Sequence, residues 1–250
     1  MSDDQPVRLF CFPNSPEGVS VFDGWAAKVG AGVQPVPISL PGGGERRVEP
    51  RVTTGAALLA DVMPQFTDPD PGPFILYGQA LGAMAALTVA RALHETGRPG
   101  PALLVVGAWP ESHPPVRPAD PRQATDEELL DVLSGNGAVP VGSDEAVWLR
   151  AMLPALRADL EFAHDLYALA GRPQPTGPLT TPVLVLDAGD DRPNSPSAAD
   201  NWRQWTGGPV RSRTVPGHHF FRRGTRDLPR LLGRICRVAD RLARKPAPIG

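Results

Sequence analysis

The sequence predicts one α/β domain with a mostly parallel sheet and a helical insertion in its second half. Short apolar runs alternate with segments of helical spacing from residue 7 to about residue 106. The connections between these runs are long enough for the strands to pair in parallel. The alternation stops at 110–180 and returns with the apolar run that begins at 182. A doubly wound sheet spanning 1–250, with a helical lid at 110–180, is the simplest architecture for this order.

Strands are expected at the apolar runs and helices at the amphipathic segments. The expected strands are 7–12, 35–44 with a break at Pro41 and the three glycines after it, 74–77, 102–106, 182–191 and 210–215. Helices are expected at 21–29, at 55–66, from Gly82 to Gly97, from Thr125 to Gly135, at 144–170, around 198–205 and at 227–243. Thr125 followed by Glu128 has the spacing of a capping box, which marks the start of the first helix in the insertion.

Composition excludes several classes of protein. The formal net charge is −2, so there is no bulk electrostatic case for binding nucleic acid or an anionic membrane surface. Two cysteines, Cys11 and Cys236, cannot form a disulfide framework. No apolar run is long enough to span a bilayer, and the acidic start of the chain is not a signal peptide. A cytoplasmic monomer is therefore expected.

The stretch YGQALGA, which begins at Tyr77, predicts a strand that turns tightly into a helix. Gly78 and Gly82 bracket the turn. In α/β hydrolases this turn is G-x-S-x-G, and its middle residue is the nucleophilic serine. Here the middle residue is Ala80, whose methyl group cannot act as a nucleophile. A glycine-bracketed turn alone is a weak signal, because other doubly wound folds also use one.

Two further stretches supply candidates for an acid and a base. DAGDD places Asp190 and Asp191 just after a buried strand, at the sheet edge where ligands bind in open α/β folds. VPGHHFF places His218 and His219 after the last strand. Taken singly, such an aspartate is more often a helix cap and such histidines are more often solvated or bonded to backbone. Their order after the elbow is nevertheless that of an α/β-hydrolase triad, in which the aspartate orients the histidine.

The chain resembles type II thioesterases, the stand-alone editing enzymes of polyketide and nonribosomal peptide assembly lines. The resemblance covers nearly the whole chain. It is carried by LFCFP with SVFDGW, LPGGGER, YGQALGA, LRADL, SPSAADNWRQWT and GHHFF. It implies an α/β-hydrolase fold.

The resemblance also implies roles for individual residues. Ala80 occupies the nucleophile position, His219 matches the base, and Asp191 matches the acid, with Asp190 as a near alternative. The backbone N–H groups of Leu81 and Ser15 would form the oxyanion hole. The other implied positions are those of substrate binding, namely Asn14, Gln79, Met152 and Leu153, with Leu149 and Leu156 as further candidates for lining an acyl channel. Plain helix packing is an equal explanation for the lid residues.

Several positions depart from the family pattern. Asn14-Ser15-Pro16-Glu17 stands where the family has His-Ala-Gly-Gly, and Gln79 stands in place of histidine. Gly43 replaces an arginine, and Ala80 replaces the serine. An engineered serine-to-alanine change would explain only the last of these. The sequence alone leaves open whether Ala80 is natural.

The implied activity is hydrolysis of acyl or peptidyl thioesters on a carrier protein, provided that position 80 is natively serine. The alternatives are an acid–base enzyme that uses His219 and Asp191 without a nucleophile, and a non-catalytic protein that binds loaded carriers. No metal or cofactor is expected beyond the carrier's own phosphopantetheine. A basic surface could dock an acidic carrier, although such a cluster is more often a solvated helix face. It would comprise Arg222, Arg223, Arg226, Arg230, Arg234 and Arg237.

Overall fold

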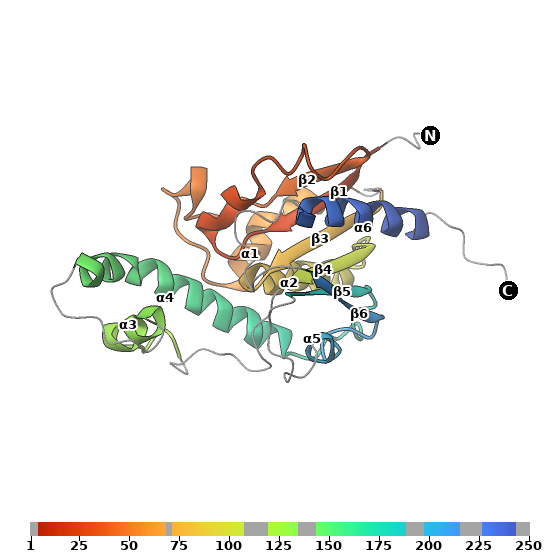
Figure 1. Ribbon diagram of the computed structural model, residues 1–250. Helices are drawn as coiled ribbons and strands as arrows, with labels where there is room; N and C mark the ends of the chain where they lie inside the picture. The colour runs from red at the N-terminus through yellow and green to blue at the C-terminus, as the bar shows by residue number, and fades with distance from the viewer. Residues whose placement is uncertain are drawn as a thin grey trace.

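The computed structural model describes residues 5–68, 72–107, 120–134, 144–188, 198–215 and 227–243. Within these ranges six strands form one parallel sheet in the order β2-β1-β3-β4-β5-β6 (Figure 1). The parallel sheet predicted from the alternating pattern is confirmed. The strands are β1 (Val7–Phe12), β2 (Val33–Pro37), β3 (Phe74–Gln79), β4 (Leu103–Gly107), β5 (Val183–Ala188) and β6 (Val210–Val215).

Helices cover both faces of the sheet. Side chains from α1, α2, α4 and α5 pack on one face, while η1 and α6 pack on the other. The α-helices are α1 (Gly55–Val62), α2 (Leu81–Glu95), α3 (Asp126–Ser134), α4 (Asp144–Ala170), α5 (Ala198–Trp202) and α6 (Asp227–Ala243). Three short 3-10 helices are η1 (Pro16–Phe22), η2 (Gly44–Arg46) and η3 (Met63–Phe66). No helix in these described ranges combines the length and apolar character needed to cross a membrane.

Two of the predicted helices differ from the structure. The α-helix predicted at 21–29 is absent: 3-10 helix η1 ends at Phe22, Asp23 after it has ψ 132°, and Gly24 has φ 71°. Trp25 is nevertheless buried against the sheet, which explains why the apolar spacing resembled a helix. The helix predicted at 55–66 changes from α to 3-10 after Val62, because Pro64 has no N–H to donate.

The capping box predicted at the start of α3 is confirmed. The Thr125 N–H donates to Glu128 Oε2 at 2.8 Å, and the Glu128 N–H donates to Thr125 Oγ1 at 3.2 Å. These reciprocal bonds satisfy two backbone donors that the helix leaves free. They fix where the helical segment between β4 and β5 begins.

Helix α4 has two differently anchored halves. Its carboxyl-terminal half packs into the main core through Phe162 and Leu166. Its amino-terminal half lies against α3 in a separate apolar cluster that includes Leu129 and Leu153 (Figure 1). Pro154 stands between the halves and removes one hydrogen bond from the helix interior. Among the described residues between β4 and β5, those in the carboxyl-terminal half of α4 thus join this segment to the main core.

Helices α2 and α4 pack against each other, and Arg91 of α2 is bonded to the end of α4. The Arg91 guanidinium on α2 donates to the Leu169 and Ala170 carbonyl oxygens at the end of α4 and to the Arg172 carbonyl beyond it. These are carbonyls that the end of a helix cannot satisfy internally. Desolvation lowers the pKa of Arg91 from its usual value. A buried arginine therefore anchors the root of α4 to the core.

Candidate active site

The turn between β3 and α2 has the geometry of a nucleophile elbow. Ala80 has φ 46° and ψ −120°, and it is the one described residue other than glycine with a positive φ. An alanine in this region is strained by about 1–3 kcal/mol, so it persists only where its surroundings dictate the turn. The Ala80 N–H donates to the Gly107 carbonyl at 3.3 Å, and the Ala83 N–H donates to the Ala80 carbonyl at 2.9 Å.

The two glycines of the turn are sterically required. A Cβ on Gly78 would lie 2.6 Å from the Ala83 backbone nitrogen. A Cβ on Gly82 would lie 2.5 Å from the Pro13 carbonyl oxygen. Strand β3 therefore meets the first turn of α2 closely, and α2 meets the chain leaving β1 just as closely. The turn therefore has the full backbone geometry of a nucleophile elbow, but the side chain of Ala80 cannot act as a nucleophile.

Leu81 is the first residue of α2, so its N–H is one of those that the helix cannot satisfy internally. The helix dipole adds partial positive charge at this end. Both features suit an oxyanion donor, which is the role predicted for Leu81. The role itself stays a prediction.

Ser15, the other predicted donor, caps η1 in extended conformation, with φ −156°. Its side chain makes no capping hydrogen bond, while its carbonyl accepts from the Gly18 N–H at 2.9 Å. The packing of Gly82 on Pro13 brings the start of this loop against α2. Asn14 is exposed on the same loop. Pro13 is thus the part of this loop that approaches the elbow, and Ser15 comes two residues after it.

Gly43 and Pro16, which both depart from the family pattern, are in contact. A Cβ on Gly43 would lie within 2.6 Å of Pro16 Cβ and would overlap the Pro16 carbonyl group. Gly43 has φ −139°, so the requirement for glycine here is purely steric. No larger residue fits at position 43 while the loop after β1 keeps its position. No sequence motif indicates this contact, because Pro16 and Gly43 lie on separate loops.

Gln79 immediately precedes Ala80 at the end of β3. Its Nε2 atom is buried, and within the described structure it has no hydrogen-bond partner. A buried amide donor without an acceptor is unfavourable by about 1–3 kcal/mol. A free donor beside the elbow suits the substrate-binding role predicted for Gln79, which stays a prediction.

Asp190, Asp191, His218 and His219 lie outside the described residues. Their flanking strands are well defined: Ala188 at the end of β5 is the register partner of Val215 at the end of β6. Because the strands are parallel, both of these ends lie at the same sheet edge as the end of β3. The chain therefore leaves the sheet toward the candidate acid and base at the edge that carries Ala80.

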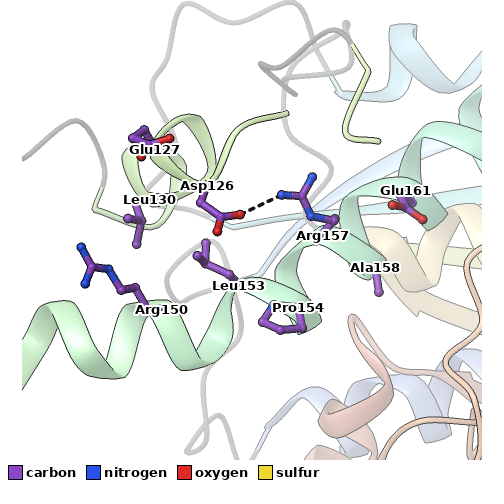
Figure 2. Close-up of a pocket in the computed structure, with 9 residues that line it drawn as sticks. All are labelled: Asp126, Glu127, Leu130, Arg150, Leu153, Pro154, Arg157, Ala158 and Glu161. Carbon is purple, nitrogen blue, oxygen red and sulfur yellow. Dashed lines mark hydrogen bonds and ion pairs between the residues drawn. The ribbon is translucent and has the colours of Figure 1, made fainter. Parts of the chain in front are cut away.

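A cavity of about 630 Å³ lies between α3 and α4 (Figure 2). Leu153, predicted to line an acyl channel, is among its lining residues. Met152, predicted with it, is 39% exposed and does not line this cavity. Leu156 packs on the apolar cluster beside α3, and the side chain of Leu149 is outside the described part. The lining also contains charged residues that leucine spacing did not indicate, namely Asp126, Glu127, Arg150, Arg157 and Glu161.

The predicted basic surface is only partly free. Arg230 and Arg234 are exposed on α6. Arg237 instead donates to the Val29 carbonyl oxygen at 3.1 Å and to that of Ala31 at 3.4 Å, so its guanidinium is engaged with backbone. The three other arginines predicted there, Arg222, Arg223 and Arg226, lie outside the described residues.

Sequence reasoning also missed Arg91, although an arginine within the apolar run of α2 was a usable signal. In the ranges that the structure describes, no three His, Cys, Asp or Glu side chains are grouped to hold a metal ion.

A parallel sheet with a strained strand–turn–helix elbow at the end of a central strand defines an α/β-hydrolase fold. The thioesterase domain family model matches residues 7–238, and the chain belongs to this family.

Relatives of this family share the chain's sequence at moderate identity. The chain is 32% identical over 222 residues to thioesterase PikA5 of Streptomyces venezuelae, covering 86% of this chain and 75% of that protein. It is 30% identical over 219 residues to a probable cadicidin biosynthesis thioesterase of Streptomyces griseus. That match covers 86% of this chain but 58% of the relative, so the chain spans somewhat more than half of that relative's length.

A solved structure shows the same fold. RedJ, a thioesterase from the prodiginine biosynthetic pathway of Streptomyces coelicolor, superposes with a TM-score of 0.68 at 31% identity. The superposition covers 93% of this chain and 85% of RedJ. The family and fold predicted from the sequence motifs are confirmed.

Proposed function

We propose that this chain is a type II thioesterase-like protein that acts on acyl or peptidyl thioesters held on a carrier protein. The observation that supports it most is the elbow: Ala80 keeps a strained conformation, φ 46° and ψ −120°, between two glycines that admit no side chain. This turn presents residue 80 at the carboxyl edge of the sheet. A serine there would need no backbone change to become the nucleophile.

With Ala80 in place no acyl-enzyme can form, so two-step hydrolysis is absent from this exact sequence. The residues that remain can still bind and polarise a thioester. In this scheme the Leu81 and Ser15 N–H groups would hold the carbonyl oxygen, and His219, oriented by Asp191 or Asp190, would hold or move a proton. We propose that the protein uses no metal or cofactor. We also propose a cytoplasmic location, which agrees with the two free cysteines, Cys11 and Cys236.

The decisive experiment is Ala80→Ser, assayed for hydrolysis of acyl N-acetylcysteamine thioesters. Restoring the nucleophile should raise the rate ~10³-fold or more, since single triad members contribute at least this much. The double variant Ala80→Ser, His219→Ala should return to the starting rate. A serine variant that folds but gains no hydrolysis would contradict a thioesterase origin for the site.

A second candidate function is supported by the contact of Gly43 with Pro16. Two departures from the family pattern form one packed feature beside the elbow, which an isolated serine-to-alanine change does not explain. This favours a natural protein that runs acid–base chemistry on a carrier-bound chain without a nucleophile. Mass spectrometry of a loaded carrier, before and after incubation, distinguishes the two: chain altered on the carrier supports this candidate, and chain released supports hydrolysis.

The carrier is the proposed partner in either case. A third possibility, that the protein only binds loaded carriers, predicts that His219→Ala leaves the pathway product unchanged. A fall in product would exclude it.

A further inference from the structure

The loop of residues 42–51 is a compact unit held by its own hydrogen bonds. The Gly42 N–H donates to the Arg46 carbonyl oxygen at 3.0 Å, and the Arg46 N–H donates to that of Gly43 at 2.9 Å. The two ends of the loop meet closely, because a Cβ on Gly42 would lie 2.7 Å from Arg51 Cα. The Arg51 guanidinium donates to the Gly42 carbonyl oxygen at 3.3 Å across the same closure. Moving Arg51 would therefore also move Gly42 and its neighbour Gly43.

This 42–51 loop lies directly against the segment that follows β1. A Cβ on Gly43 would overlap the Pro16 carbonyl group, and a Cβ on Gly44 would lie 3.1 Å from Val19 Cγ1. Both contacts fall on η1, whose N-cap is Ser15. The Ser15 N–H is one of the two proposed oxyanion donors, and such a donor must lie about 2.7–3.1 Å from the oxyanion. Small shifts of η1 would therefore weaken it.

The 42–51 loop is also fastened to two helices. Arg46 donates to both carboxylate oxygens of Asp61 on α1, at 2.7 and 2.8 Å. Arg51 donates to Asp159 Oδ1 on α4 at 2.7 Å, and these two side chains are 19% and 26% exposed. Arg51 thus contacts both the closure of the loop at Gly42 and the helix α4.

Asp159 belongs to the part of α4 that is anchored in the core. It comes five residues after Pro154, which removes one hydrogen bond from the helix interior. It comes three residues before Phe162, which is fully buried in the main core, and Leu166 follows one turn later. The carboxylate therefore offers Arg51 a partner whose position is set by core packing.

From these contacts we propose that Arg51 is a positioning residue for the oxyanion hole. By joining Asp159 to Gly42, it holds the 42–51 loop against Pro16 and thereby keeps the Ser15 N–H in place. This inference rests on the proposed function, because Ser15 is an oxyanion donor only in that scheme. Arg51 acts through the contact of the two loops and not on the thioester itself.

The first measurement needs no catalytic activity. Asp159→Asn removes the charge that Arg51 meets and keeps the size of the side chain. In a two-dimensional amide NMR spectrum of the chain with Ala80, we expect the Ser15 resonance to shift in this variant. The Leu81 resonance should stay, because Leu81 begins α2 and is held by the elbow.

Asp165→Asn is the matched control. Asp165 lies on the same helix, and its Oδ2 atom accepts a hydrogen bond from the Gly55 N–H at 2.7 Å. The substitution therefore weakens a link from α4 to α1 and leaves the link to the 42–51 loop intact. The Ser15 resonance should not move in this variant.

The second measurement separates positioning from substrate binding. In the Ala80→Ser background, Asp159→Asn should lower kcat for hydrolysis of an acyl N-acetylcysteamine thioester about tenfold, with little change in KM. The reason is that a displaced oxyanion donor is missed mainly in the transition state. Asp159→Glu keeps the charge and should recover part of the loss, and Asp165→Asn should keep the full kcat.

An unmoved Ser15 resonance in Asp159→Asn would overturn the proposal, because the bonds to α1 alone would then hold the loop. Equal effects of the two asparagine variants, or a kcat that Asp159→Asn leaves unchanged, would overturn it too. If the serine variant gains no hydrolysis at all, the proposed function fails. The Ser15 resonance still decides in that case whether Arg51 holds the loop, so the two failures are told apart.

Discussion

Arg51 donates to Asp159 Oδ1 at 2.7 Å and thereby joins the loop before α1 to helix α4. The two side chains are 19% and 26% exposed, so the pair is partly shielded from water. Arg51 also donates to the Gly42 carbonyl at 3.3 Å, next to the Gly43 that lies against Pro16. A continuous line of contacts therefore runs from the loop after β1 to α4.

Asp159→Asn should weaken this connection and lower the free energy of unfolding by about 1–2 kcal/mol, because a partly buried charged hydrogen bond is lost. Urea unfolding measures the change. Asp227→Asn is the control, since its contact with Arg230 spans 4.0 Å between strongly exposed side chains and should contribute less than about 0.5 kcal/mol. If the two variants lose equal free energy of unfolding, the Arg51–Asp159 pair contributes no more than an exposed ion pair.

Gly43→Ala should destabilise the protein by about 1–3 kcal/mol, because the added methyl group must displace the Pro16 backbone. Gly100→Ala is the matched control. A Cβ there would meet only Thr181 Oγ1, at an ordinary 3.7 Å. Thermal unfolding of the two variants measures the difference. A Gly43→Ala variant as stable as the control would mean that the loop after β1 moves freely and that Gly43 and Pro16 are not coupled by packing.

Much of the fold followed from the sequence because its signals are local. The apolar runs located the strands, and Thr125 with Glu128 located the start of α3. The failure at 21–29 arose because Trp25 and Val29 are buried by a turn rather than by a helix. Tertiary packing, not local spacing, decides the conformation there.

The candidate site was predictable to a smaller extent. The elbow at Ala80 followed from two glycines at fixed spacing. The contact of Gly43 with Pro16 and the charged wall containing Glu161 depend on which loops and helices meet in space. No sequence motif indicates which of these loops and helices come into contact.

Arg91→Met should cost about 2–4 kcal/mol of stability, because it removes the side-chain donor of the Ala170 and Arg172 carbonyl groups and one of the two donors of the Leu169 carbonyl. Arg91→Lys should recover part of the loss, since an ammonium group keeps the charge but cannot reach all three oxygens in the same fork. Hydrogen exchange should show the root of α4 opening more readily in the methionine variant. Unchanged exchange there would contradict the anchoring role of Arg91.

Stability should fall at alkaline pH because two thiols are buried. Burial raises the pKa of Cys236 to about 12 and that of Cys11 well above its usual value. Above about pH 8.5, the ordinary thiol pKa, the unfolded chain loses these protons while the folded chain keeps them. Unfolding then releases protons, so the free energy of unfolding decreases as pH rises from about 9 toward 12. Urea unfolding at pH 8 and pH 10.5 should show the loss, and Cys236→Ala should reduce it; an unchanged pH slope in that variant would exclude the Cys236 contribution.

Arg230→Glu combined with Arg234→Glu should weaken binding of an acidic carrier protein if the exposed face of α6 takes part in docking. Both guanidinium groups are exposed, whereas Arg237 is bonded to backbone at Val29 and Ala31 and is left unaltered. Reversing two charges should lower the affinity several-fold at low salt and much less at high salt, because exposed charges are screened. The double variant Arg47→Glu, Arg98→Glu changes the net charge equally at two other exposed positions and serves as the control. If both double variants bind the carrier alike, α6 does not form the docking surface, and any effect reflects net charge alone.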